Sequence, residues 1–294
     1  MQNQADWIAV DCGADRVHLW AMLGERALAA AELAPGAAFE VAGFESLLPD
    51  SFRACLPDGP IDLVVCGWQP EAGASLTWRP VPAAPLPKAL HRVMRGDAGL
   101  RLHLVPGLSQ DSPCAAICGA ETRIAGFLSR HANWDGVICL PGAHTTWAHV
   151  SADEVVSFQS FMTGEMLALL SEHSVLHAAV GEGWDDAAFD TALSDAMARP
   201  EALAARLSAI HAAHLLKGRE DPSARARLSG LLIGAELAAA RPYWLGQQVA
   251  VIGGGATAAL YERALGLQGV PVIRADASEM TLAGLMAAHS QQTG

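Results

Sequence analysis

Charged residues are scarce in this sequence. They form 17% of its 294 residues, against about 25% in an average soluble protein. The 19 Lys and Arg are outnumbered by 31 Asp and Glu, which gives a net charge of −12, and the basic residues are scattered along the chain. Because an acidic chain repels a phosphate backbone, this balance predicts that nucleic acids are not partners. The hydrophobic share of 51% is sufficient for a large core and excludes extensive disorder.

Membrane segments and secretion signals are missing as well. No apolar stretch approaches the ~20 residues that a membrane-spanning helix needs. The N-terminus, MQNQADWIAV, lacks the basic and apolar regions of a signal peptide. The six cysteines include no CxxC pair, and a chain of this length does not need a disulfide framework. We therefore expect a cytoplasmic protein with no membrane partner.

Short apolar runs separated by glycine turns predict a three-stranded β-meander at two places. The first meander takes in residues 7–10, 17–23 and 26–32, and the second takes in 137–140, 147–150 and 154–158. Other apolar runs of strand length stand at 61–66, 102–105, 249–252 and 270–274. Helical spacing predicts helices over 39–55, 121–131, 163–176, 187–216 with a break at Arg199-Pro200, 229–240, 257–267 and 280–289. The prolines of 79–87 and the polar residues of 109–113 predict irregular loops.

This order of elements predicts an α/β protein made of two similar halves, each a β-meander with helices. The similarity is one of topology, because the two halves share no repeat at the level of residues. No linker rich in Ser, Gly or Pro divides them. We expect the boundary between Gly119 and Gly136, before the second meander, and set the two domains at 1–125 and 126–294.

Three predicted strands end in glycine turns: Asp11-Cys12-Gly13, Leu140–Thr145 and Ile252–Gly255. A glycine turn at a strand end exposes main-chain N–H groups, which can hold phosphate oxygens. Asp11 is a candidate for Mg²⁺, because this cation prefers carboxylate and phosphate oxygens, and the hydroxyl of Thr145 would add a donor. Any one of these turns is more often an ordinary tight turn. The patterns GxxxxGK[ST] and GxGxxG are both absent.

The order of the three turns is that of the actin-like sugar kinases, in which two phosphate loops precede an adenosine loop. Longer runs are more specific: LPGAHTTW at 140–147, FMTGEM at 161–166 and LSGLLIGAE at 228–236. Shorter runs at 105–108, 119–122 and 173–176 match in the same register. Over nearly its whole length, the sequence resembles the 2-dehydro-3-deoxygalactonokinase family.

The resemblance implies a two-domain actin-like ATPase fold of the ribonuclease H-like kind, which closes over its substrates. Residues 1–125 would form the sugar-acid side of the cleft, and residues 126–294 would form the nucleotide side. The implied reaction is the phosphorylation of 2-dehydro-3-deoxy-D-galactonate on its terminal hydroxyl by ATP with Mg²⁺. The implied partners are this sugar acid and the nucleotide, and a homodimer is left open.

The chain departs from the family pattern in loops that the resemblance places at the cleft. In the first loop, Cys12 replaces a Trp, and Ala14-Asp15 replaces a pair of hydroxyl residues. In the second loop, Ala143 replaces a Thr and Thr146 replaces a Lys, while Cys118 replaces an Arg further upstream. Asp15 would bring negative charge beside a phosphate site. Two alternatives therefore stay open: a binding or regulatory protein without kinase activity, and a kinase for another sugar acid.

Phosphoryl transfer to a hydroxyl needs a carboxylate base, for which Asp111 and Glu121 are the candidates. The alternatives are a solvated loop position for Asp111 and, for Glu121, the first turn of the following helix. Gly67, Arg79 and Glu165 are assigned to the sugar acid, whose carboxylate needs cationic or N–H donors. For Glu165, the alternative is the start of a helix capped by the residue two positions before it.

The residues assigned to ATP follow the three turns. They are Asp11, which also holds Mg²⁺, with Gly13, Ala14, Gly142, Ala143, His144, Thr145, Gly253, Gly254 and Gly255. A structural histidine with satisfied hydrogen bonds is the alternative for His144. Glu236 lies in an apolar helical run, so we expect it to be buried with a hydrogen-bonding partner.

Overall fold

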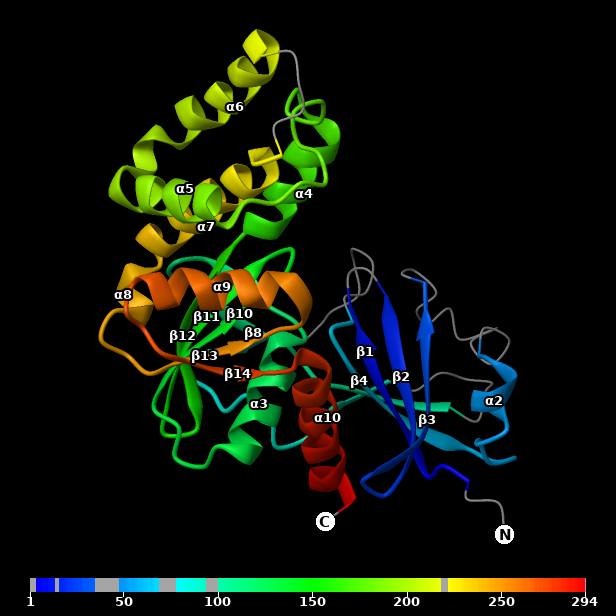
Figure 1. The fold of residues 1–294 in the computed structure, drawn as a ribbon. Helices are drawn as coiled ribbons and strands as arrows, with labels where there is room; N and C mark the ends of the chain where they lie inside the picture. Colours follow the sequence, from blue (N-terminus) through cyan, green and yellow to red (C-terminus); the bar gives the residue numbers. More distant parts are fainter. Residues whose placement is uncertain are drawn as a thin grey trace. The chain divides into compact units, whose positions relative to one another are not determined.

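The computed structural model describes residues 4–13, 16–34, 48–68, 78–93, 100–217 and 222–293. The chain forms two compact units, each with its own sheet and core (Figure 1). Unit 1 comprises Met1–Asp135, Val150–Ser157 and Asp276–Gly294. Unit 2 comprises Gly136–His149 and Phe158–Ala275.

The main sheet of unit 1 has six strands in the order β3-β2-β1-β4-β7-β6. These strands are β1 (Trp7–Cys12), β2 (Val17–Leu23), β3 (Arg26–Leu33), β4 (Ile61–Cys66), β6 (His91–Val93) and β7 (Leu100–Leu104). The first three form the predicted antiparallel meander, and β4 and β7 extend it in parallel to β1. Apart from Asp62 and His103, the runs predicted at 7–10, 61–66 and 102–105 are apolar because both faces of this sheet are covered.

Two helices of unit 1, α3 (Ala120–Arg130) and α10 (Ala277–Thr293), pack against each other with their backbones in contact (Figure 1). A Cβ on Gly126 would overlap the carbonyl of Met280, and one on Gly284 would overlap the carbonyl of Thr122. Only glycine permits this approach at either position. The close packing fixes the start of α3 against the start of α10.

A small sheet that the sequence did not predict stands beside the main one. It pairs β5 (Arg79–Pro80), β8 (Leu108–Gln110) and β9 (Ala115–Ile117) in the order β5-β8-β9. The predictions of irregular loops over 79–87 and 109–113 were therefore wrong in part. These strands have two or three residues and draw their pairing from a partner 29 positions away, as between Arg79 and Leu108. A run so short carries no alternation that a sequence pattern can reveal.

Unit 2 repeats the strand order of unit 1. Its sheet has the order β12-β11-β10-β13-β14, formed by β10 (Gly136–Leu140), β11 (Thr145–Ser151), β12 (Glu154–Phe161), β13 (Val249–Ile252) and β14 (Val272–Ala275). The last three in this order are parallel. This matches β3-β2-β1-β4-β7 strand for strand, which confirms the predicted duplication of the meander.

The helices of unit 2 are α4 (Thr163–His173), α5 (Asp186–Ala198), α6 (Leu203–Lys217), α7 (Ala224–Ala239), α8 (Arg241–Trp244) and α9 (Gly255–Leu267). A short 3-10 turn at Pro200–Ala202 separates α5 from α6, as predicted at Arg199-Pro200. Gly230 and Gly234 of α7 approach the backbone of α5, where a Cβ would lie 2.5 Å from a carbonyl oxygen. Among the described residues, no helix combines the length and apolar character that crossing a membrane requires.

Two predictions, one of a helix and one of the domain bounds, differ in part from what the structure describes. Of the helix predicted over 39–55, the structure describes the last part, where α2 (Asp50–Arg53) buries Phe52. The two units differ from the predicted domains at 126–135, 150–157 and 276–294, which all group with unit 1. The division into a sugar-acid domain at 1–125 and a nucleotide domain at 126–294 stays a prediction.

Candidate functional site

The carboxyl ends of β1 and β4 bring Asp11 and Gly67 together in unit 1. Asp11 pairs with Cys66 across the two parallel strands, so Gly67 follows at the same edge of the sheet. Gly67 has a φ of +72°, and a Cβ there would lie 2.6 Å from the carbonyl oxygen of Cys12. Gly119, with a φ of +93°, packs on the Cα of Gly67. Glycine is required at both positions, and it places the start of α3 beside the two strand ends.

Three side chains hold the carboxylate of Asp11, which is 6% exposed. Arg123 Nη2 of α3 lies 3.4 Å from Oδ2, and Thr281 Oγ1 of α10 donates to the same oxygen at 3.4 Å. The thiol of Cys66 donates to Oδ1 at 3.6 Å. Burial is the largest single influence on Arg123 and lowers its pKa, but Asp11, Cys66 and Glu121 together outweigh it and raise that pKa. The charge of Asp11 is therefore compensated within unit 1.

Arg123 and Thr281 were not among the predicted site residues. Arg123 directly follows the run 119–122 that resembles the family, and this position beside a candidate site is the signal that could have identified it. Thr281 is 270 positions from Asp11, and nothing in the sequence associates the two. Their meeting depends on the backbone contact between α3 and α10 described above.

The surroundings of Asp11 fit a magnesium ion that has a single carboxylate as its protein ligand. Oδ1 has a weak thiol contact, so this oxygen retains lone pairs for a cation. Within the described residues, no group of three or more His, Cys, Asp or Glu side chains is placed to hold a metal. Mg²⁺ is commonly held by one or two carboxylates together with waters and substrate phosphates. Asp11 alone fits that pattern, whereas a site made only of protein ligands does not.

Glu121 is fully buried in the first turn of α3. Its Oε1 accepts hydrogen bonds from the Gly119 N–H at 2.8 Å and from Thr122 Oγ1 at 3.2 Å. In the part of the chain that the structure describes, its Oε2 has no hydrogen-bond partner. Burial raises the pKa of Glu121 to about 7, although the donors to Oε1 oppose this rise. One oxygen thus accepts hydrogen bonds at the start of the helix, as the alternative had it, and the other is buried without a donor among the described residues.

Arg79 is the cation that influences Glu121. Its Nη1 donates to the Ala84 carbonyl at 2.7 Å and its Nη2 donates to the Pro85 carbonyl. Its Nε is buried and has no partner among the described residues. Burial lowers the pKa of Arg79, and the charge of Glu121 opposes this. Glu121 Oε2 and Arg79 Nε are thus both buried without a partner among the described residues, and the two side chains interact electrostatically. Buried polar atoms without partners are expected where a polar ligand binds.

Asp111, the other candidate base, has a different environment. It is exposed and follows β8, at the turn that leads into β9. Its carboxylate is open to solvent, whereas that of Glu121 is fully buried. Burial therefore favours Glu121 over Asp111 as the base. Of the nucleotide residues predicted in the first turn, Gly13 is half-buried, and Ala14 lies outside the described residues.

In unit 2, the second and third glycine turns leave the same edge of the sheet. β10 and β13 are neighbouring parallel strands in which Cys139 pairs with Val251. A Cβ on Gly253 would lie 3.5 Å from Pro141, so the two turns are adjacent. Gly254 and Gly255 are exposed, with open space where a side chain would be. Gly255 begins α9, whose first N–H groups form a favourable site for an anion.

The turn at 141–144 is packed against the start of α4. Glu165 donates its N–H to the Ala143 carbonyl at 2.9 Å, and a Cβ on Gly164 would overlap the Gly142 carbonyl. His144 Nε2 lies 2.6 Å from Oε2 of Glu165. His144 and Glu165, which the sequence assigned separately to nucleotide and sugar acid, are thus paired.

The expected role of the Thr145 hydroxyl needs correction. The side chain is fully buried, and Oγ1 is hydrogen bonded to the hydroxyl of Tyr261 at 2.8 Å. It points into the core of unit 2 and does not present a donor to phosphate. The physical reason is that Thr145 begins β11, whose first four residues are all buried, so its side chain is enclosed by the core. The main-chain N–H of Thr145 remains a candidate donor to a phosphate oxygen.

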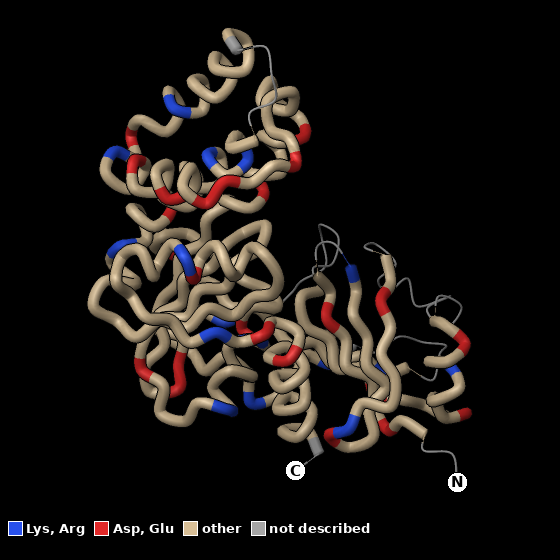
Figure 2. The backbone as a smooth tube through the Cα atoms, viewed as in Figure 1, with Lys and Arg blue, Asp and Glu red and all other residues tan. Residues whose placement is uncertain are grey.

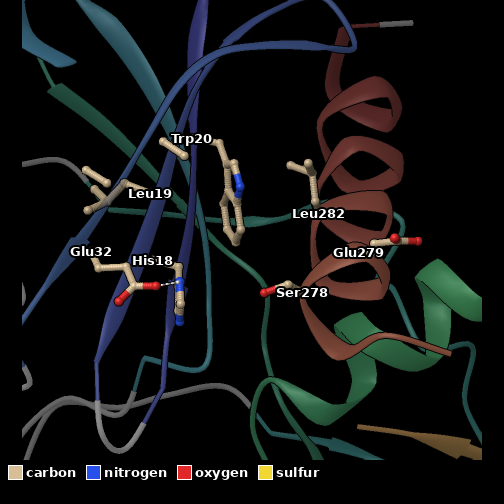
Figure 3. A pocket seen from close by; sticks show the side chains of 9 residues that line it. His18, Leu19, Trp20, Glu32, Ser278, Glu279 and Leu282 are labelled. Carbon is tan, nitrogen blue, oxygen red and sulfur yellow. Dashed lines mark ion pairs between the residues drawn. The ribbon is translucent and has the colours of Figure 1, made fainter. Parts of the chain in front are cut away.

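A separate pocket of about 460 Å³ lies in unit 1 between strands β2 and β3 and helix α10 (Figure 3). Trp20 and Leu282 face each other across it, and His18 Nδ1 lies 3.5 Å from Oε1 of Glu32. None of the predicted site residues lines this pocket. Figure 2 shows Lys and Arg interspersed with Asp and Glu in both units, as the scattered basic residues of the sequence imply.

The duplicated strand order defines the class of the protein: it has the actin-like ATPase fold. The activator of 2-hydroxyisocaproyl-CoA dehydratase from Clostridium difficile, solved with bound ADPNP, has a TM-score of 0.51 to this chain at 11% identity. That comparison covers 98% of this chain and 97% of the other. At such low identity the likeness concerns the fold alone, and it confirms the predicted fold class.

The particular family follows from closer relatives. The sequence model of 2-keto-3-deoxy-galactonokinase matches residues 11–288. A protein of Rhizobium meliloti (strain 1021), described as a probable 2-dehydro-3-deoxygalactonokinase, is 32% identical over 303 residues, which cover 98% of each chain. The 2-dehydro-3-deoxygalactonokinase of Escherichia coli (strain K12) is 26% identical over 283 residues, covering 91% of this chain and 92% of the other.

A solved structure supports the same family. A crystal structure from Sinorhizobium meliloti, assigned to the 2-dehydro-3-deoxygalactonokinases, has a TM-score of 0.84 and 30% identity, and covers 96% of this chain and 95% of its own. This chain therefore belongs to the 2-keto-3-deoxy-galactonokinase family.

Proposed function

We propose that this chain transfers a phosphoryl group from ATP to the terminal hydroxyl of 2-dehydro-3-deoxy-D-galactonate, with Mg²⁺ as the metal. The observation that carries the proposal is the family match over residues 11–288. Two relatives that bear the name of this kinase support it. The reaction breaks one phosphate P–O bond, forms another to the sugar hydroxyl, and releases ADP and one proton. The chain must therefore bind phosphates, orient the hydroxyl and accept that proton.

Phosphate binding is proposed for the two adjacent glycine turns of unit 2. Their support is the open space around Gly254 and Gly255 and the uncapped N-terminus of α9. The exposed turn of Gly142, Ala143 and His144 lies next to them. Main-chain N–H groups there would hold phosphate oxygens with no basic side chain. Asp11, with Gly13 beside it, would hold Mg²⁺, which when bound neutralises charge on the phosphates.

Glu121 is proposed as the base. Its Oε2 accepts no hydrogen bond from the described residues, and this oxygen would accept the proton of the sugar hydroxyl. A pKa of about 7 suits this task, because such a base is ionised in about half the molecules at neutral pH and still binds a proton well. Asp111 becomes the second choice because it is exposed.

Arg79 is proposed to meet the carboxylate of the sugar acid through its free Nε. Gly67 is packed on Cys12 and Gly119, so the support for its assignment is its place at the strand end beside Asp11. Glu165 would contact a sugar hydroxyl through Oε1 while its Oε2 stays paired with His144 at 2.6 Å. These three assignments rest on position and charge.

A coupled assay tests the function. Purified protein is given ATP, Mg²⁺ and 2-dehydro-3-deoxy-D-galactonate, and ADP release is followed together with the mass of the product. We expect equal amounts of ADP and phosphorylated acid. Folded protein that binds ATP and the acid but forms no product would favour the inactive binding protein. Turnover with a different acid only would favour a kinase of other specificity.

A further inference from the structure

Glu236 of α7 is a buried acid that the proposed reaction does not use. It is 3% exposed, and burial raises its pKa. Trp147 Nε1 donates to its Oε1 at 2.8 Å, and the Tyr261 hydroxyl donates to its Oε2 at 2.7 Å. The expectation of a buried, hydrogen-bonded Glu236 is confirmed. Both oxygens are occupied by donors from other elements, β11 and α9, so this carboxylate ties three elements of unit 2 together.

The first connection from Glu236 ends at the glycine turn of residues 141–144. The Tyr261 hydroxyl has one proton, which goes to Glu236, so its oxygen accepts the proton of Thr145 Oγ1 at 2.8 Å. Thr145 is the residue that directly follows the turn. Thr145 also hydrogen bonds with Glu236 itself, so the acid holds the residue after the turn both directly and through Tyr261. Tyr261 is itself on α9, the helix that begins at Gly255.

The second connection from Glu236 ends at the helix packed on the same turn. The hydroxyl of Thr163, which is buried, hydrogen bonds with Glu236 and counteracts the rise of its pKa. Thr163 is the first residue of α4. The next two residues of that helix make the backbone contacts with Gly142 and Ala143 described above. Glu236 is thus connected by hydrogen bonds to Thr145, which follows the turn, and to Thr163, the first residue of the helix that packs against the turn.

We infer that Glu236 and Tyr261 are positioning residues for the glycine turn of residues 141–144, so that the affinity for ATP depends on them although neither belongs to the turn. The inference rests on the proposed function, in which this turn holds phosphates. Hydrogen bonds from main-chain N–H groups to phosphate depend steeply on geometry. A turn released at Thr145 samples more conformations and must be ordered again when the nucleotide binds, which weakens binding.

Tyr261→Phe is the decisive variant because it keeps the ring and removes the hydroxyl. We expect Kd for ATP, measured by calorimetry, and KM for ATP to rise about three- to tenfold, as for one lost hydrogen bond. KM for the sugar acid should stay unchanged. Glu236→Gln should shift the same two quantities in the same direction, because its amide group cannot accept from both donors.

Trp244→Phe is the matched control. Trp244 is buried in the same core, and its Nε1 donates to the Leu237 carbonyl at 2.9 Å, so the variant also loses one buried hydrogen bond. It should lower Tm as Tyr261→Phe does but leave Kd for ATP unchanged. If Tyr261→Phe does not fold, Thr145→Val breaks the same connection from the other side.

Two results would overturn the inference. A Tyr261→Phe protein with lowered Tm and the wild-type Kd for ATP would show that the network serves stability alone. Equal changes in Kd for Tyr261→Phe and Trp244→Phe would mean the same. Calorimetry needs no sugar acid, so this test stands even if the kinase assay fails. A wild-type protein that does not bind ATP would overturn both proposals.

Discussion

Arg123 Nη2 lies 3.4 Å from Oδ2 of Asp11, although the two residues are 112 positions apart. The carboxylate is almost completely buried, and Arg123 is the cation that compensates it. A buried ion pair costs much desolvation, so removing one partner destabilises the fold more than the pair itself stabilises it. This pair therefore couples the proposed metal ligand to the packing of α3 and α10.

Replacing Arg123 should reveal that coupling. Arg123→Met leaves a buried carboxylate without a counter-charge, and we expect the free energy of unfolding to fall by about 3 kcal/mol. Mg²⁺ at Asp11 would replace the lost charge, so added Mg²⁺ should raise Tm of the variant more than that of the wild type. Thermal unfolding with Mg²⁺ or with a chelator measures this. Asp11→Asn is the control and should lose the Mg²⁺ effect, whereas an equal effect in all three proteins would refute the metal assignment.

The raised pKa of Glu121 predicts how stability depends on pH. With a pKa of about 7 when folded and the ordinary value of 4.5 when unfolded, the folded state holds the proton more tightly. The stabilising contribution is complete below about pH 4.5 and is lost as pH rises toward about 7. Glu121→Gln should thus match the wild type near pH 4.5 and exceed it near pH 8 by on the order of 3 kcal/mol. Denaturant unfolding at both values measures the difference, and a constant difference would contradict the shift.

The same group predicts how activity depends on pH. A base must be ionised, so kcat/KM should rise tenfold per pH unit below about 7 and level off above it. Glu121→Gln should lose about two to four orders of magnitude in kcat with little change in KM for ATP. Asp111→Asn is the matched comparison because it removes an exposed carboxylate. If Asp111→Asn loses activity and Glu121→Gln keeps it, the assignment of the base is reversed.

The close packing of α4 on the glycine turn is tested at Gly164. A Cβ there would overlap the Gly142 carbonyl, so Gly164→Ala must displace the turn. We expect a loss of about 2 kcal/mol in stability and weaker ATP binding. Gly266 lies in α9 with nothing within 4 Å of its Cβ position, and Gly266→Ala should stabilise the protein by about 0.5 to 1 kcal/mol. Chemical denaturation and calorimetry separate the two, and unchanged ATP binding in Gly164→Ala would contradict the proposed role of the turn.

The buried thiols should resist modification. Burial raises the pKa of Cys66 and Cys139 well above the ordinary range, and both side chains are inaccessible. Since the thiolate is the reactive form, we expect them to react with a thiol reagent only after unfolding. Cys114 is exposed and should react within the native protein. Mass spectrometry after brief labelling identifies the modified residues, and rapid labelling of Cys139 in folded protein would contradict the packing of unit 2.

Prediction from the sequence succeeded where one element carries the whole signal. Apart from Asp11 and Asp62, the strands at 7–12, 61–66 and 136–140 consist of apolar residues and glycine because they are buried on both faces, so their pattern does not depend on a partner. In contrast, β5, β8 and β9 form by pairing with one another, and no local pattern of apolar residues predicted them.

Within the site, the sequence alone indicated the glycine turns, Glu121 as a candidate base, the buried position of Glu236, and the family to which the chain is similar. These follow from residue types and spacing, which the chain carries in linear order. Only the tertiary structure decided that Arg123 and Thr281 hold Asp11, that Glu121 has a free oxygen, and that the hydroxyl of Thr145 turns inward to Tyr261. Hydrogen bonds and burial depend on the few ångströms between side chains from distant segments, and those distances are set only when helices and strands pack.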